Sequence, residues 1–360
     1  MNPGRYLPIA GLIAAVIGVQ LLTFYTGSAY MLTQLTMSSY YSLVIIGLCI
    51  LIGYAGQISI GHAGFFAIGG YISAFLTTYD LLPYKSQGLI SFFSKAGLLV
   101  LADDLYGGQV LHFQPWAACV LAVLFTIIVA YLIGGPVLKL KGHYLAMATL
   151  GFGIIVYRTV LGTSFFGAAD GLSDVPPFVI FPGLEVSGKA SGRVQNYYIA
   201  LGLVVLGVIL LLNLVHSRIG RALRSIHGAE DAAGAMGVNT AKYKLNIFVL
   251  SAVFAAIAGV LLTHYNGGIG PSEASVMKSV RYVAIVAIGG MANLWGALSM
   301  GIILNFLSLR GYFGSYDDAV FGVILILIML FAPEGLLRRE VFRGAKKWIS
   351  GRGKVEGQKA

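Results

Sequence analysis

GYAGQISIGHAGFFAIGGYISAFL, residues 53–76, is the stretch that organises this chain. It lies between apolar runs long enough to cross a bilayer, yet it is rich in glycine and carries Gln57, Ser59 and His62. In hydrocarbon, irregular polar backbone is tolerated only where protein surrounds it or where it lines a water-filled cavity. The stretch therefore predicts a central seam or a translocation pathway lined by Gln57, Ser59 and His62. A second interpretation stays open, in which the glycines only let helices approach closely and the polar groups form interhelical hydrogen bonds.

Composition places the rest of the chain in lipid as well. Hydrophobic residues make up 58% of the chain and charged residues only 11%, whereas soluble domains carry about 25% charged residues. Apolar runs approaching the roughly 20 residues of a membrane span occur at 7–27, 31–52, 61–79, 115–135, 143–162, 197–215, 245–263, 280–291, 295–309 and 319–332. The last three are short, so we expect an all-α polytopic membrane bundle of about eight to ten transmembrane helices. The first run is too long for the apolar region of a cleaved signal peptide.

The positive charges predict the orientation of the bundle. Lys and Arg gather in the loops 136–142 and 216–244 and in the tail, whereas the loops 80–114 and 163–196 are mixed or acidic. Because cytoplasmic loops are the basic ones, both termini are expected to be cytoplasmic. The expected division is a transmembrane domain at 1–337 and a basic cytoplasmic tail at 338–360, whose residues 340–349 resemble an amphipathic helix on anionic membrane lipid. The net charge of +10 follows this loop pattern and no nucleic-acid module, so no nucleic-acid partner is expected.

The sequence offers no site for chemistry. Cys49 and Cys119 have neither the spacing of a disulfide framework nor that of a metal site. Residues 183–189 match the GxxxxGK spacing of a phosphate-binding loop, but Ala190 stands where Ser or Thr is needed. The only charges within the predicted spans are Arg158 and Arg281, near span ends, whereas ion-coupled carriers place ionisable groups inside the membrane. We therefore expect no enzyme activity and no cofactor, with the driving force supplied by a separate subunit.

The loop 216–244 is the second informative stretch. Arg218, Arg221 and Arg224 share one face of a helix, and Glu230-Asp231-Ala232-Ala233 leads to Gly237, which predicts a helix end. Such a short cytoplasmic helix is typical of an element that docks on a partner. A solvated loop that only sets topology is the alternative.

Two further stretches carry structural signals. Residues 285–306, IVAIGGMANLWGALSMGIILNF, share the glycine-rich texture of residues 53–76 and hint at a second segment along the pathway. In the loop 163–196, Phe178–Phe181 predicts either a short strand or part of an irregular cap.

Several blocks of the chain together resemble the LivM-type permeases of branched-chain amino acid ABC importers. GYAGQISIGHAGFFAIGGY (53–71) is similar to the signature segment of that family, and LKLKGHYLAMATLGFG (138–153) to its next block. SRIGRALRSIHGAEDAAGAMGV (217–238) and KLNIFVLSAVFAAIAGVLL (244–262) resemble its cytoplasmic loop and following span, and AIGGMANLWGALSMG and LFAPEGLL complete the match. The resemblance covers most of the chain, in the right order.

The resemblance implies a multi-pass subunit of the bacterial inner membrane that pairs with a second permease. Two cytoplasmic ATPase subunits, which bind the ATP, and an extracytoplasmic solute-binding protein would complete the importer. On the family's EAA-like loop, the coupling role carries over to Glu230, Ala232, Ala233 and Gly237. Ile154, the stretch FGAADG (166–171) and the insert 82–114 depart from the family pattern.

The expected function is therefore that of a permease subunit translocating branched-chain, hydrophobic amino acids. The departures concern the solute more than the architecture, so urea, amides or other amino acids remain alternatives. A self-sufficient secondary carrier is the rival of another class, and a membrane-embedded enzyme is a third.

Overall fold

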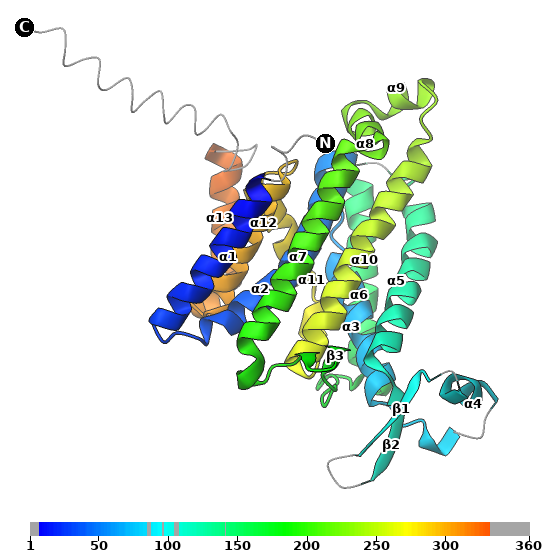
Figure 1. Cartoon of the computed structure of the whole chain (residues 1–360). Coiled ribbons are helices and arrows are strands. Elements are labelled where there is room, and N and C mark those ends of the chain that lie inside the picture. Colours follow the sequence, from blue (N-terminus) through cyan, green and yellow to red (C-terminus); the bar gives the residue numbers. More distant parts are fainter. Residues whose placement is uncertain (1–6, 85–87, 96, 104–107, 141, 332–360) are drawn as a thin grey trace, which may run out of the picture.

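The computed structural model describes residues 7–84, 88–95, 97–103, 108–140 and 142–331, which form one helical bundle with small β-hairpins at one end (Figure 1). The ten predicted spans each coincide with a helix. These are α1 (Leu7–Tyr25), α2 (Met31–Ala55), α3 (His62–Thr78), α5 (Pro115–Val137), α6 (His143–Gly162), α7 (Arg193–His216), α10 (Thr240–Asn266), α11 (Val276–Gly289), α12 (Leu294–Leu309) and α13 (Asp317–Phe331). Within the described residues, α1, α2, α5, α6, α7 and α10 are long and apolar enough to cross a membrane on their own. The prediction of an all-α polytopic membrane bundle is confirmed.

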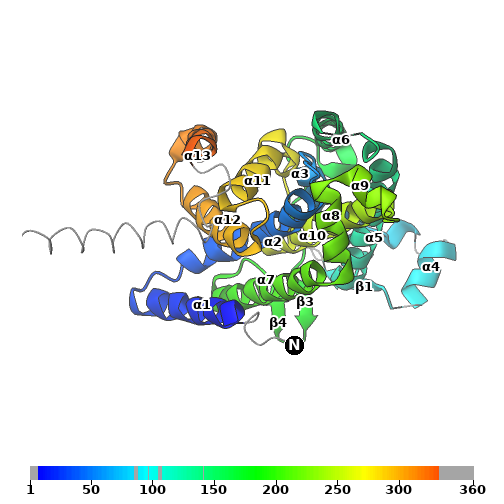
Figure 2. The same ribbon diagram turned by 90° about the horizontal axis from the view of Figure 1, so that it is seen from above.

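Helix α2 forms the centre of the bundle. Its side chains from Tyr40 to Leu51 are almost completely buried, because α7, α10, α11 and α12 pack around it. The view along the bundle shows α2 and α10 in the middle and α1, α6 and α13 at the periphery (Figure 2). A helix that is apolar all round is expected in such a central position.

Glycines allow α3 and α10 to pack with their backbones close together. A Cβ atom added at Gly69 would overlap the Ala256 carbonyl, and one added at Gly259 would overlap the Phe66 carbonyl. Small residues at helix contacts serve this purpose in membrane proteins. The packing interpretation of the glycine-rich stretch is therefore correct for its second half.

The first half of that stretch breaks the helix. α2 ends at Gly56, whose left-handed backbone (φ +68°) lets its N–H bond to the Ile52 carbonyl, and α3 begins only at His62. A second break separates α11 from α12 and includes Gly290 (φ +99°). The two breaks meet, since the Tyr54 hydroxyl donates to the Ala292 carbonyl at 3.0 Å. The two segments with similar glycine-rich texture thus lie against each other.

The two ends of the bundle carry different structures (Figure 1). One end has the short helices α8 (Arg218–Gly228) and α9 (Glu230–Ala235). The opposite end has α4 (Gly88–Lys95) and two antiparallel hairpins, formed by β1 (Leu99–Asp103) with β2 (Gln109–Phe113) and by β3 (Phe178–Phe181) with β4 (Leu184–Val186). The loops 80–114 and 163–196 therefore share the end opposite the loop 216–244, as the charge pattern predicts, and the strand Phe178–Phe181 is confirmed. The GxxxxGK match lies in the β3–β4 hairpin, and the tail 338–360 with its expected amphipathic helix lies outside the described residues.

Candidate functional site

Gln57, one of the predicted pathway residues, borders a cavity at the end of the bundle that carries α8 and α9. The side chain is only 2% exposed, and neither its amide nitrogen nor its amide oxygen has a hydrogen-bond partner within the described structure. The cavity has a volume of about 220 Å³ and is also lined by His227, Glu230 and Lys244. An unpaired buried polar group costs free energy, and this volume holds several water molecules at about 30 Å³ each. The cavity is therefore suited to a polar occupant.

An ion pair between Glu230 and Lys244 connects this cavity to the predicted coupling loop. The Lys244 Nζ and Glu230 Oε1 atoms are 2.6 Å apart, and the two side chains are 10% and 28% exposed. The pair ties α9 to the beginning of α10 and also lines a second hollow of about 480 Å³ beside Gly134 and Leu245. Residues from the two separately predicted sites, Gln57 and Glu230, thus meet in one place.

The other two predicted pathway residues, Ser59 and His62, hold the helix break in position. The Ser59 hydroxyl lies 3.1 Å from His62 Nδ1, and His62 Nε2 lies 2.8 Å from the Ser251 hydroxyl on α10. The Ile60 N–H donates to the Thr149 hydroxyl on α6 at 3.0 Å. The side chains of Ser59 and His62 are therefore buried and hydrogen-bonded, and neither lines the cavity beside Gln57.

Helices α8 and α9 form a short arm with an inner and an outer face. On α8, Gly220, Leu223 and Ile226 are buried, whereas Arg218, Arg221 and Arg224 are exposed, as their spacing predicts. On α9, Ala233 is buried and Ala232 is exposed. Met236, which follows α9, is 85% exposed. We call α9 together with Met236 and Gly237 the α9 arm. Gly237, with φ +82°, ends the arm where the sequence predicts a helix stop.

Sequence reasoning missed a charged cluster inside the bundle. Glu273 and Lys278 form an ion pair with an oxygen–nitrogen distance of 2.7 Å, and both bond to the Tyr41 hydroxyl of α2. They lie before the apolar run that starts at Val280, so hydropathy alone places them outside the membrane. The signal was the shortness of that run, since 280–291 cannot cross a bilayer alone and residues before it must enter the membrane.

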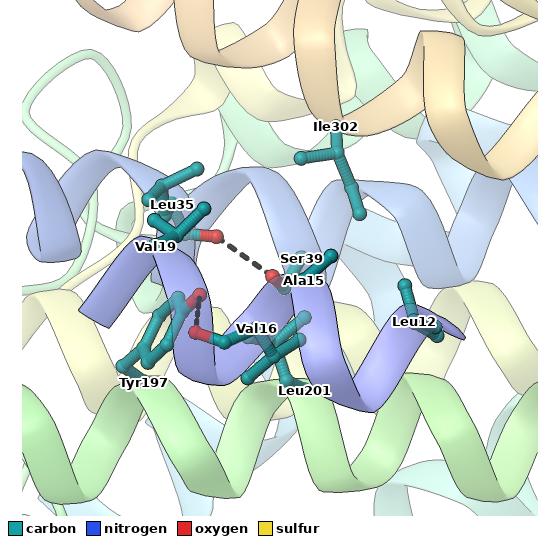
Figure 3. Close-up of a pocket in the computed structure, with 9 residues that line it drawn as sticks. All are labelled: Leu12, Ala15, Val16, Val19, Leu35, Ser39, Tyr197, Leu201 and Ile302. Atoms are coloured by element: carbon teal, nitrogen blue, oxygen red, sulfur yellow. Dashed lines mark hydrogen bonds between the residues drawn. The ribbon is translucent and has the colours of Figure 1, made fainter. Parts of the chain in front are cut away.

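An apolar crevice between α1, α2, α7 and α12 is a poor candidate for a solute site (Figure 3). It has a volume of about 120 Å³, and most of its lining is aliphatic. Its hydroxyls are already used, because Ser39 donates to the Leu35 carbonyl and Tyr197 to the Val16 carbonyl. The crevice lies at the exposed helix α1, where a lipid chain fits its chemistry.

Comparison with known proteins gives a consistent picture. The family model described as "Branched-chain amino acid transport system / permease component" matches residues 30–329. The LivM high-affinity branched-chain amino acid transport permease of Salmonella typhimurium is 31% identical over 342 residues, which cover 89% of this chain and 72% of the relative. The LivM protein of Escherichia coli K12 is also 31% identical (84% and 68% covered), and the LivH permease of the same strain is 27% identical (86% and 94% covered). No solved structure matches the chain.

Proposed function

The chain belongs to the permease family of branched-chain amino acid transport systems, and on that basis we propose that it carries branched-chain amino acids through the bacterial inner membrane as one subunit of an ABC importer. The relatives named LivM and LivH are two different permeases of such systems. This supports pairing with a second, related permease. The importer is completed by two ATPase subunits, which bind the ATP, and by a solute-binding protein on the outer side. The chain itself holds no cofactor and catalyses no reaction.

The single observation that carries the mechanism is the cavity shared by Gln57, Glu230 and Lys244. Gln57 belongs to the helix break, and Glu230 belongs to the α9 arm, whose exposed Ala232 and Met236 offer a small apolar surface to an ATPase subunit. Movement of α9 on ATP binding is transmitted through the 2.6 Å ion pair to Lys244 and α10. We assign Glu230, Ala232, Ala233 and Gly237 to coupling and Gln57 to the inner end of the pathway, with Ser59 and His62 holding the wall of that pathway in place.

The orientation follows from the same assignment. The α8–α9 end faces the cytoplasm, because its loop is rich in Lys and Arg. The hairpin end then faces the solute-binding protein. We divide the chain into a permease domain at 1–337 and a basic tail at 338–360, as its charge pattern predicts.

Uptake of labelled leucine by cells with and without this gene tests the proposal. We expect gene-dependent uptake that stops on ATP depletion and continues when the membrane potential is collapsed. Uptake that instead stops with the potential identifies a secondary carrier. ATP-dependent uptake of urea or amides without leucine uptake identifies the same architecture with another solute.

Replacing Gln57 with leucine separates a pathway role from a packing role. The two side chains have similar size, and the substitution removes two buried amide atoms without partners, so the melting temperature of the purified complex should stay the same or rise. Leucine uptake should nevertheless fall by roughly tenfold, since a hydrogen-bonding group worth about 1.4 kcal/mol at the inner end of the pathway is lost.

The matched control is Gln34→Leu in α2, because Gln34 also carries a buried amide oxygen without a partner in the described structure. This variant should transport normally. Equal uptake by Gln57→Leu and the unaltered importer would remove Gln57 from the pathway.

A further inference from the structure

The membrane body contains a closed triangle of polar contacts that the mechanism above does not use. The Glu273 carboxylate accepts from Lys278 Nζ at 2.7 and 2.8 Å and from the Tyr41 hydroxyl at 3.0 and 3.2 Å. Lys278 Nζ also donates to the Tyr41 oxygen at 2.9 Å and lies 4.5 Å from the centre of its ring. A cation, an anion and an aromatic ring are thus held at one point.

This triangle lies at depth within the bundle. Tyr41 is ten residues beyond the start of the 25-residue helix α2, which places it about 15 Å along the helix. The chain after α10 returns along α3. Ile269 lies against Gly70 in the middle of α3, and the Ser279 hydroxyl accepts from the Ala63 N–H, at the start of α3, at 3.1 Å. Glu273 and Lys278 lie within this returning segment. Charges at such depth are costly, and they face the protein interior or water rather than lipid.

The ion pair is nevertheless not sealed within this chain. The side chains of Glu273 and Lys278 are 17% and 23% exposed, and their neighbours Met277 and Val280 are 54% and 39% exposed. In the view along the bundle, α11 and α3 reach the edge between α13 and α6 (Figure 2). Because charged groups do not face lipid at this depth, the partial exposure of the pair fits an edge that borders the second permease and an aqueous path.

Hydroxyl groups without partners surround the pair. Tyr71 and Tyr282 are each only 1% exposed, and their hydroxyls bond to nothing in the described part of the chain. The Tyr282 ring packs beside that of Tyr41, with ring centres 6.3 Å apart, and Tyr71 follows Gly70, which lies against Ile269 of the returning segment. Leaving two buried hydroxyls unpaired costs free energy, which marks this as a place for a polar occupant. Phe66, stacked on Tyr41 with ring centres 5.7 Å apart, supplies an apolar wall.

We propose that Glu273 and Lys278 bind the ammonium and the carboxylate of the transported amino acid midway through the membrane. A free amino acid carries both charges on one carbon atom, so it can replace each partner of the resting ion pair without leaving an unpaired charge. Tyr71 and Tyr282 add hydrogen bonds, and Phe66, Met277 and Val280 contact the aliphatic side chain. Urea and amides carry neither charge, so the site selects a zwitterion. This inference rests on the proposed function and names the solute class of the same pathway.

A double variant distinguishes binding from a purely structural role. Glu273→Gln/Lys278→Met removes both charges together and leaves no buried charge unpaired, which is the tolerated way to alter a buried ion pair. The complete importer is reconstituted with its solute-binding protein, and ATP-driven leucine uptake is measured together with co-purification of the subunits and the basal ATPase rate. We expect normal assembly and basal ATPase activity, with uptake lowered at least about tenfold because charge-assisted hydrogen bonds to the solute are lost.

The control is Gln20→Leu/Tyr198→Phe, which removes an exposed hydrogen bond between α1 and α7 and should leave uptake unchanged. Uptake by the Glu273/Lys278 double variant equal to that of this control would overturn the inference, although leucine transport itself would stand. No ATP-driven leucine uptake by the unaltered importer would overturn the proposed function and this inference with it.

A second measurement does not depend on any variant. A diazirine analogue of leucine, photolysed in the unaltered importer during turnover, should label peptides containing Phe66, Met277 or Val280. Labelling of the permease confined to other segments would overturn the inference.

Discussion

Replacing Glu230 with lysine is expected to lower ATP-driven uptake strongly. Lys244 is only 10% exposed and depends on the Glu230 carboxylate 2.6 Å away, and breaking a buried pair from one side costs about 3–5 kcal/mol. The partial exposure of Glu230 lowers this figure, but the substitution also sets two ammonium groups against each other. The α9 arm should therefore detach from α10. Leucine uptake and co-purification of the ATPase subunits are the two measurements, and both should fall by at least about tenfold.

Two further variants assign this effect to the ion pair. The exchange Glu230→Lys/Lys244→Glu restores opposite charges at the same place and should recover a large part of the uptake. Glu185→Lys introduces the same change at the exposed pair with Lys189, whose side chains are 38% and 64% exposed. It should leave co-purification of the ATPase subunits unchanged, because such surface pairs contribute about 0–1 kcal/mol and this pair lies at the end opposite α9. If Glu230→Lys leaves both uptake and co-purification intact, the α9 arm is not the docking element.

The sequence predicted the helices well because each span carries its own signal. Ten apolar runs coincide with ten helices, since hydropathy and length are properties of single segments. The break between α2 and α3 also falls between the predicted spans 31–52 and 61–79. The contacts of these residues were not predictable, because Gln57 and Glu230 share a cavity only through the packing of α8 on α2 and of α9 on α8 and α10.

Polarity alone did not separate the roles of the candidate residues either. Gln57, Ser59 and His62 looked equivalent in sequence, yet Ser59 and His62 bond to each other and to Ser251, whereas the Gln57 amide has no partner in the described structure. The ion pair of Glu273 and Lys278 was missed for a different reason. A segment that enters the membrane and turns back has no long apolar run, so a search for spans places its charges outside the bilayer.

Gly53 lies where the two helix breaks meet, and we expect Gly53→Ala to destabilise the complex strongly. A Cβ atom at Gly53 would overlap the Met291 carbonyl and also press on the backbone of Ala292. These are backbone atoms, so no side chain can move aside to make room. The break between α11 and α12 must shift, and the bonds from Cys49 to the Met291 carbonyl and from Tyr54 to the Ala292 carbonyl are lost with it.

Overpacking of this kind costs about 3 kcal/mol or more where the neighbours cannot yield. We therefore expect Gly53→Ala to lower the melting temperature of the purified complex strongly and to reduce the yield of monodisperse protein. Gly202→Ala in α7 is the matched control, because nothing lies within 4 Å of a Cβ atom at that exposed position, and alanine favours a helix over glycine by about 0.5–1 kcal/mol. The same added methyl group should thus stabilise the complex at Gly202 and destabilise it at Gly53. Equal melting temperatures for the two variants would show that the breaks do not touch, and the pathway would then have to be placed elsewhere in the bundle.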